Sequence, residues 1–277
     1  TILGFEAMSN SIAGDQNTAI GYKALTLFDQ NTTGEFGNTA VGYTAGQFLS
    51  SSRGCTFVGN KAGLGSGANK QTGNYNTAIG DSAGLALVGT ANNNTFVGYA
   101  CGDGVTTGIG NTGLGANCAF DIDANNQTAI GGGATTDSAN DIAVGNTSVD
   151  EIKGQVDFST FSDKRIKREI KNGDLGLKFI NLLKPRKFKK VNPAKYPKSI
   201  KKPTDGLGEW TDAQANKVWD GLIAQEVKSA LDSCNTTFSG WNEEKNSKQL
   251  VTYSTLVVPL IKAVQELSAE VKQLKAE

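Results

Sequence analysis

A glycine-anchored repeat runs through the first half of this 277-residue sequence and constrains its fold more than any other feature. In nine units the residue before the glycine is aliphatic, the residue three positions after it is small, and threonine lies three positions before it in eight of the nine. The anchors, spaced 14 to 21 residues apart, are Gly4, Gly21, Gly42, Gly59, Gly80, Gly98, Gly115, Gly131 and Gly145. Such regular units predict a repeat architecture rather than a disordered glycine-rich segment.

The residue types within a unit predict β-structure. The threonine and the aliphatic residue lie two positions apart, so on a strand they share one face, which suits β-branched side chains. The glycine and the small residue mark tight turns or close packing. Each unit is therefore expected to form one coil of a β-solenoid, with equivalent positions stacked about 4.8 Å apart. An asparagine four positions before the glycine is expected to form a side-chain ladder or to satisfy a turn, at Asn17, Asn38, Asn76, Asn94 and Asn111.

The chain changes character near Ser162. Residues 1–161 hold 5 Lys/Arg, 13 Asp/Glu and 28 of the 34 glycines, whereas residues 162–277 hold 22 Lys/Arg, 14 Asp/Glu and all 5 prolines. The net charges are −8 and +8, which indicates two different kinds of structure. We expect solenoid repeats over 1–150, a connecting stalk over 151–161 and an α+β domain over 162–277.

Composition excludes several kinds of site. Histidine is absent, which removes Ser-His-Asp triads, Cys-His dyads and HExxH zinc sites. The four cysteines show no CxxC spacing, so no metal site and no cofactor are expected. Cys101 and Cys118 occupy the small position of consecutive units, which predicts buried thiols, with a disulfide as the alternative. No stretch approaches the roughly 20 apolar residues of a membrane span. The lysines of 184–202 lack a nucleic-acid-binding motif, so no nucleic-acid partner is expected.

The second half mixes helix and strand signals. Apolar residues at 175, 179, 182 and 183 predict a helix that ends at Pro185. Residues 188–191 predict a strand, 195–208 an exposed loop, and 219–228 a strand that leads into a helix. Residues 253–275 carry an unbroken heptad pattern, typical of a coiled coil. Valine at the a positions with leucine at d favours two strands rather than three.

Four motifs in this half occur in an order that resembles the endosialidase-type intramolecular chaperone domain at the C-terminus of phage tail spikes and fibres. The motifs are Ser162-Asp163-x-Arg165-x-Lys167, Leu182-Leu183-x-Pro185-x-x-Phe188, Gly221-Leu-Ile-Ala-Gln225-Glu226-Val227 and Tyr253-x-x-Leu256. The repeats in turn resemble those of phage tail fibres and of trimeric autotransporter adhesin heads. The resemblance implies a homotrimer, with a trimeric β-roll or β-helix followed by a chaperone that ends in a coiled coil. A thin coil filled with small residues would have little core of its own, which agrees with burial against sister chains.

The resemblance also implies self-cleavage. Ser162 would be the nucleophile, Lys167 the general base, and Phe161–Ser162 the scissile bond. A lysine can serve as base where desolvation or nearby cations lower its pKa, and Lys164, Arg165 and Arg168 are the candidate cations. Direct attack and an N→O acyl shift through an ester both stay open.

Simpler structural roles compete with the catalytic ones. Ser162 could be only a helix N-cap. Asp163 could orient Lys167 or act as a cap. Gln225 and Glu226 could be contacts between protomers rather than members of an active site.

The leading hypothesis is a viral tail fibre or spike, assembled in the host cytoplasm and carried in the virion, that binds a host surface receptor. The receptor would be a glycan or an outer-surface protein, and residues 25–36 and 48–53 are candidate contact loops. A trimeric cell-surface adhesin and a structural fibre that is not cleaved, each carrying the same trimerisation domain, are the alternatives.

Overall fold

The computed structural model describes residues 1–10, 16–28, 37–201, 205, 210–244 and 247–277. Contacts divide the chain into two compact units, one built on Thr1–Val149 and the other on Asp150–Lys201 with Trp210–Glu277. Of the candidate contact loop 25–36, residues 29–36 lie outside the described part, and Leu25 and Phe28 are buried. Within residues 48–53, Leu49 and Ser52 are buried too.

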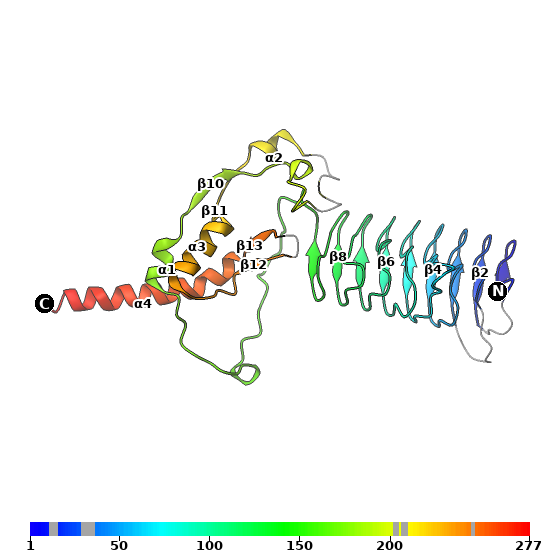
Figure 1. Cartoon of the computed structure of the whole chain (residues 1–277), viewed down its shortest axis with the longest axis horizontal. Coiled ribbons are helices and arrows are strands. Elements are labelled where there is room, and N and C mark those ends of the chain that lie inside the picture. The colour runs from blue at the N-terminus through cyan, green and yellow to red at the C-terminus, as the bar shows by residue number, and fades with distance from the viewer. Residues whose placement is uncertain (11–15, 29–36, 202–204, 206–209, 245–246) are drawn as a thin grey trace. The chain divides into compact units, whose positions relative to one another are not determined.

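The first unit is a parallel β-solenoid, as the repeat predicts (Figure 1). Its nine strands form one sheet in chain order, each hydrogen-bonded to the next. The strands are β1 (Ile2–Leu3), β2 (Thr18–Ile20), β3 (Thr39–Val41), β4 (Thr56–Val58), β5 (Thr77–Ile79), β6 (Thr95–Val97), β7 (Thr112–Leu114), β8 (Thr128–Ile130) and β9 (Ile142–Val144). The anchoring glycine follows each strand and turns the chain towards the next side of the coil.

Pairing is in register from coil to coil. In β2 and β3, for example, Thr18 pairs with Thr39 and Ala19 with Ala40. The middle residue of β2 to β6 and of β8 is fully buried, so it points into the coil. The threonine and the aliphatic residue share one face, as predicted, and that face is the outer one.

The solenoid has a core of its own, and the expectation of an interior filled only with small residues is wrong. Phe28, Phe57 and Phe96 are fully buried among the alanines. Room for these rings comes from glycine: a Cβ added to Gly63 would lie 2.5 Å from the Phe57 ring, and one on Gly102 would lie 2.5 Å from the Phe96 ring. Small and large interior residues thus complement one another along the axis.

The anchoring glycines stack on one another through their backbones. Gly80, for example, has φ +135°, a conformation that side chains of L-residues rarely adopt. A Cβ at this position would lie 2.5 Å from the carbonyl oxygen of Gly98 in the next coil. The repeat therefore requires glycine for two reasons, backbone angle and space.

The predicted asparagine ladder is present, and it satisfies backbone groups in two directions. Asn94 Oδ1 accepts a hydrogen bond from the backbone N–H of Asn111 at 2.9 Å, while Asn94 Nδ2 donates to the carbonyl of Gly108 at 2.8 Å. Asn38 Oδ1 likewise accepts from the backbone N–H of Cys55 at 2.9 Å, and Asn38 Nδ2 donates to the carbonyl of Ser52 at 2.8 Å. Each of these buried amides joins its own coil to the next one, while in the coil of β4 Cys55 takes the asparagine position.

The second unit is a small α+β assembly. Its elements are η1 (Lys164–Ile166), α1 (Leu177–Leu182), β10 (Arg186–Lys189), η2 (Pro193–Lys195), α2 (Asp212–Asn216), β11 (Val218–Gly221), α3 (Ala224–Cys234), β12 (Trp241–Glu243), β13 (Gln249–Val251), η3 (Tyr253–Leu256) and α4 (Val257–Leu274). β10 pairs antiparallel with β11, and β12 with β13. α1 packs against α3 and α4 over a core centred on Phe179, Val227 and Leu231.

Two expected elements differ in their bounds from the structure. The strand expected over 188–191 is β10, which covers Arg186–Lys189. The terminal helix α4 begins at Val257 rather than at Tyr253, because residues 253–256 form the 3-10 turn η3. Of the predicted loop 195–208, residues 202–204 and 206–208 lie outside the described part of the chain. Among the described helices, none combines the length and apolarity that a bilayer crossing requires.

Candidate functional site

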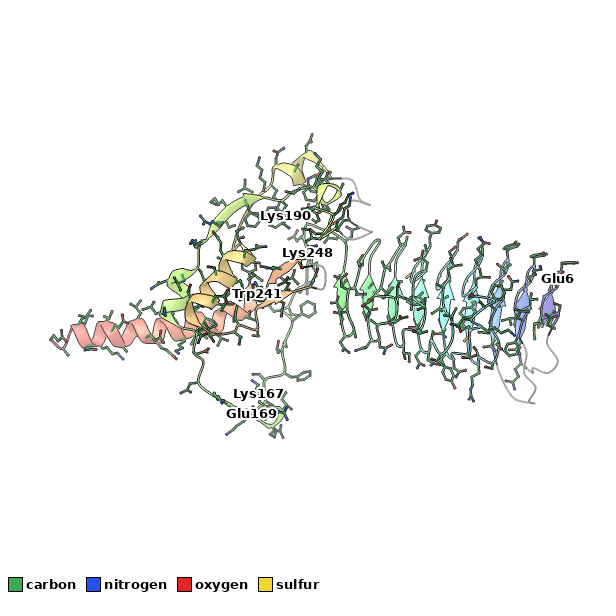
Figure 2. All side chains as sticks on the ribbon, in the orientation of Figure 1. Glu6, Lys167, Glu169, Lys190, Trp241 and Lys248 are labelled. Carbon is green, nitrogen blue, oxygen red and sulfur yellow. The ribbon has the colours of Figure 1, made fainter. Side chains whose placement is uncertain are left out.

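The candidate cleavage site lies on an exposed length of chain that precedes α1. Residues 155–163 contain no helix or strand, and the short turn η1 follows them. Figure 2 labels Lys167 just beyond η1 on this segment. The backbone of Lys167 is extended, with φ −120° and ψ 144°, so the turn ends at this residue. The Lys167 side chain reaches back towards Ser162.

Ser162 and Lys167 meet through their side chains. Lys167 Nζ donates a hydrogen bond to Ser162 Oγ over 2.6 Å. This is within the distance at which a base takes the proton of a nucleophile. The turn η1 brings the two residues together, since it shortens the path between positions five apart. The geometry of a Ser-Lys pair is therefore present within a single chain.

Asp163 is bonded to Arg165 rather than to Lys167. Its carboxylate accepts from the backbone N–H of Arg165 at 2.8 Å and from the guanidinium at 2.7 to 3.2 Å, so it caps η1. The Arg165 side chain, and then its backbone N–H, lower the pKa of the Asp163 carboxyl. The capping residue of this turn is thus Asp163, and Ser162 stays free to contact Lys167.

The residues of the site are exposed to solvent. Ser162, Lys167 and Arg168 are all exposed, and Phe161, which carries the candidate scissile carbonyl, is almost fully so. Among the candidate cations, Arg165 already pairs with Asp163 at 2.7 Å. One chain therefore provides the contact between Ser162 and Lys167, but the described residues do not shield that contact from water.

Four residues of the other motifs meet in the second unit. Leu222 N–H donates to the hydroxyl of Tyr253 at 2.7 Å, although the two residues are far apart in sequence. A Cβ added to Gly221 would lie 2.5 Å from that hydroxyl and 3.2 Å from the ring of Phe188. Glycine at 221 therefore leaves the space that Tyr253 and Phe188 occupy, and these residues hold β10, β11 and η3 together.

Glu226 forms an ion pair with Arg186, whose guanidinium donates at 2.6 and 3.1 Å. Arg186 lowers the pKa of Glu226, chiefly through the side-chain hydrogen bond. Sequence reasoning missed Arg186, since one basic residue among many in a strand gives no distinctive signal. Pro185 lies between α1 and β10, and Gln225 is exposed at the start of α3. None of these residues bonds to Ser162 or Lys167 in the described part of the chain.

The four cysteines are free thiols, and Cys55, Cys101 and Cys118 are buried. Within the described residues no group of three or more cysteine and acidic side chains could hold a metal ion. No family model, no curated protein and no solved structure matches this chain.

Proposed function

We propose that this chain is the C-terminal part of a homotrimeric viral tail fibre or spike that binds a host surface receptor. In this proposal residues 162–277 trimerise and fold the upstream β-solenoid and are then released by autoproteolysis between Phe161 and Ser162. The observation that carries the cleavage is the 2.6 Å hydrogen bond between Lys167 Nζ and Ser162 Oγ. The fibre assignment draws on the parallel β-solenoid.

The proposed reaction needs no partner molecule except water. The neutral amine of Lys167 takes the proton of the Ser162 hydroxyl, and Oγ attacks the carbonyl carbon of Phe161. The C–N bond then breaks, and the leaving α-amino group of Ser162 takes up the proton. With Ser162 Oγ as the nucleophile, breakage of the C–N bond leaves the Phe161 acyl group on Oγ as an ester, and water hydrolyses this ester to the Phe161 carboxylate and the free hydroxyl. In an N→O acyl shift the ester lasts long enough for hydroxylamine to cleave it and speed the cut, whereas in direct attack the ester is hydrolysed as soon as it forms.

Assembly into a trimer would supply the shielding from water that the Ser162–Lys167 contact lacks in a single chain. Burial or a nearby cation lowers the pKa of a lysine amine, so that more of it is in the neutral form that can accept a proton. In the proposed trimer, neighbouring chains cover the exposed segment around Ser162 and shield the amine of Lys167. Cleavage would then follow assembly.

The terminal helix supports an assembly of several chains. The heptad residues of α4 are 41 to 71% exposed, although they are all aliphatic. Ala263 and Pro259, on another side of the helix, are the buried ones. An aliphatic stripe that the chain itself does not cover is typical of a coiled-coil seam. The stripe consists of Val257, Leu260, Val264, Leu267, Val271 and Leu274.

Intact mass measurement tests the cleavage. We expect the purified chain to separate into fragments that end at Phe161 and begin at Ser162, and we expect Ser162→Ala and Lys167→Ala to stay whole. Lys171→Ala is the matched control, because Lys171 is an exposed lysine a few residues further along the same segment, has no proposed role in the site and should leave the cut unaffected. Full-length wild-type chain that light scattering shows to be trimeric would contradict the cleavage and favour a fibre that is not cut.

The chaperone role has a separate test. A solenoid made without residues 162–277 should aggregate. A solenoid that first folds as part of the full chain should stay dispersed after the cut. A solenoid that is trimeric and dispersed when made alone would contradict the chaperone role.

A further inference from the structure

Three side chains hold the stretch of chain at residues 173–177, just before and at the start of α1, and we call them the clamp. The clamp consists of Thr236, Lys262 and Glu266. Lys262 Nζ donates a hydrogen bond to the carbonyl of Gly173 at 2.6 Å. Thr236 Oγ1 donates to the carboxylate of Asp174 at 2.5 Å. Thr236 follows α3 and Lys262 lies in α4, so the clamp ties the start of α1 to two elements that are distant in sequence.

Glu266 of α4 supplies the cap that α1 itself lacks. Gly176 occupies the N-cap position, and no side chain there accepts from the helix. Glu266 Oε2 instead accepts from the backbone N–H of Leu177 at 2.6 Å, and a carboxylate suits the positive end of a helix. A Cβ added to Gly176 would overlap this carboxylate, so glycine leaves the space that the clamp needs.

The cleavage segment, which we define as residues 150–172, has no comparable attachment of its own. In the part of the chain that the structure describes, each hydrogen bond or ion pair of this segment joins two of its own residues, as Ser162 and Lys167 do. The clamp begins at Gly173, six positions after Lys167. It is therefore the first polar attachment of the reacting pair to the folded second unit.

Helix α4 uses different faces for the clamp and for other copies of the chain. Lys262 and Glu266 lie on the face that is turned to α1, and the two helices pack side by side (Figure 1). Pro259 and Ala263 follow the same helical spacing and are buried. The aliphatic stripe of α4 lies on another face and is exposed. The clamp and a coiled coil through the stripe can therefore exist at the same time.

We infer that the clamp positions the reacting pair. It fixes the end of the cleavage segment beside α4, where the copies join, and so sets how often Ser162 and Lys167 reach the shielded arrangement in which the bond is cut. The inference rests on the proposed self-cleavage and adds three positioning residues to it. In the described structure none of the three contacts Ser162 or Lys167, so they act through the path of the chain.

The length of the free tether gives the size of the effect. Beyond Gly173 the next buried apolar residues are Leu175 and Phe179, eight and twelve positions from Lys167. The concentration of a tether's end near a fixed point falls with about the −3/2 power of the tether's length. Opening the clamp therefore lowers this concentration about 1.5-fold where Leu175 still holds the chain, and about threefold where the chain is free up to Phe179.

Rates of the cut in the full chain test the clamp. Pulse-labelled chain from cell-free synthesis gives the rate of cleavage on denaturing gels, and the label in the trimer fraction gives the rate of assembly. We expect Glu266→Ala to assemble as fast as wild type and to cut about 1.5 to 3 times more slowly. Glu266→Gln keeps an acceptor oxygen and should cut at close to the wild-type rate. Glu270→Ala, which removes an exposed carboxylate from the same helix, is the matched control.

A longer tether with the clamp intact provides a readout that a merely structural role would not change. Six Gly/Ser residues inserted after Lys171 double the separation between Lys167 and Gly173. The cut should then slow about threefold, while urea unfolding of the second unit followed by tryptophan fluorescence stays as in wild type. Thr236→Val, which opens the clamp from outside α4, replaces Glu266→Ala if that variant fails to assemble.

The outcomes separate this inference from the proposed self-cleavage. Wild-type chain that forms trimers and never cuts would overturn both. Wild-type chain that cuts, together with a wild-type rate in either the assembled clamp variant or the insertion variant, would overturn the positioning role alone and leave the clamp as a structural cap of α1.

Discussion

Asn94 accepts a hydrogen bond through Oδ1 from the backbone N–H of Asn111, one coil further along, at 2.9 Å. Both residues are fully buried. The amide of Asn94 thus pairs a backbone donor that the strand ladder does not reach, and its Nδ2 pairs the carbonyl of Gly108. An unpaired buried backbone group costs about 1–3 kcal/mol, so these side chains have a larger effect on stability than their number implies.

Asn94→Ala should therefore lower the free energy of unfolding of the solenoid by about 2–4 kcal/mol, because it leaves the Asn111 N–H and the Gly108 carbonyl unpaired. Far-UV circular dichroism in a urea titration measures this free energy of unfolding, and a Ser162→Ala background keeps the chain whole during the measurement. Asn69→Ala, at an exposed position, is the control and should change stability by less than about 0.5 kcal/mol. Equal effects of the two variants would contradict the ladder.

Gly80→Ala should lower the stability of the solenoid more than Asn94→Ala does. The new Cβ would lie 2.5 Å from the Gly98 carbonyl oxygen, and φ at this residue is +135°. Strain of this kind costs about 1–3 kcal/mol before the clash is counted, so we expect a loss above about 3 kcal/mol or a failure to fold. Gly104→Ala, where an added Cβ meets nothing within 4 Å, should be nearly neutral in the same urea titration. A stable Gly80→Ala solenoid would show that neighbouring coils can separate.

The Cys55 thiol should make the solenoid sensitive to alkali. Burial raises its pKa from 9.0 to about 11, so the folded state holds the proton more tightly than the unfolded state. Stability from this group is present below pH 9 and is lost as pH rises through about 11. Cys55→Ala removes this contribution, so its melting temperature should fall less than that of wild type between pH 8 and pH 11. Parallel curves for the two proteins would exclude Cys55 as the cause.

Much of the solenoid could be predicted because its determinants are local. The spacing between threonine, aliphatic residue and glycine states which residues share a strand face, and repetition shows that the coils stack. The direction of that face could not be predicted from spacing alone. A period of two places Thr18 and Ile20 on the same face of the strand, but it does not say whether that face points into the coil or out of it. Ala19 decides it: only a small or precisely accommodated side chain fits between neighbouring coils, so the middle residue points inward.

The second unit was less predictable, because its contacts join residues distant in sequence. The motif serine and lysine are five positions apart, and a single turn brings them together. By contrast, Tyr253 meets Leu222 across 31 positions, and Arg186 meets Glu226 across 40. No periodicity predicts such pairs. The motif order indicated that these residues matter, and the structure shows what several of them touch.

Tyr253→Phe tests whether this motif residue is structural. It removes the hydroxyl that accepts from Leu222 N–H at 2.7 Å, so we expect the second unit to lose about 0.5–1.5 kcal/mol of stability. All three tryptophans, Trp210, Trp219 and Trp241, lie in this unit, so tryptophan fluorescence in urea follows it without signal from the solenoid. Ser254→Ala, an exposed neighbour, is the control.

The same Tyr253→Phe substitution, made with Ser162 intact, separates a structural role from a catalytic one. Tyr253 is bonded to Leu222 and not to Ser162 or Lys167 in the described part of the chain, so the folded variant should still cut itself at close to the wild-type rate. The cut should fail only at urea concentrations that unfold the second unit. A variant that keeps its tryptophan emission and its trimeric mass but no longer cleaves would place Tyr253 at the reacting bond. In that case the contact with Leu222 describes the chain before the site is assembled.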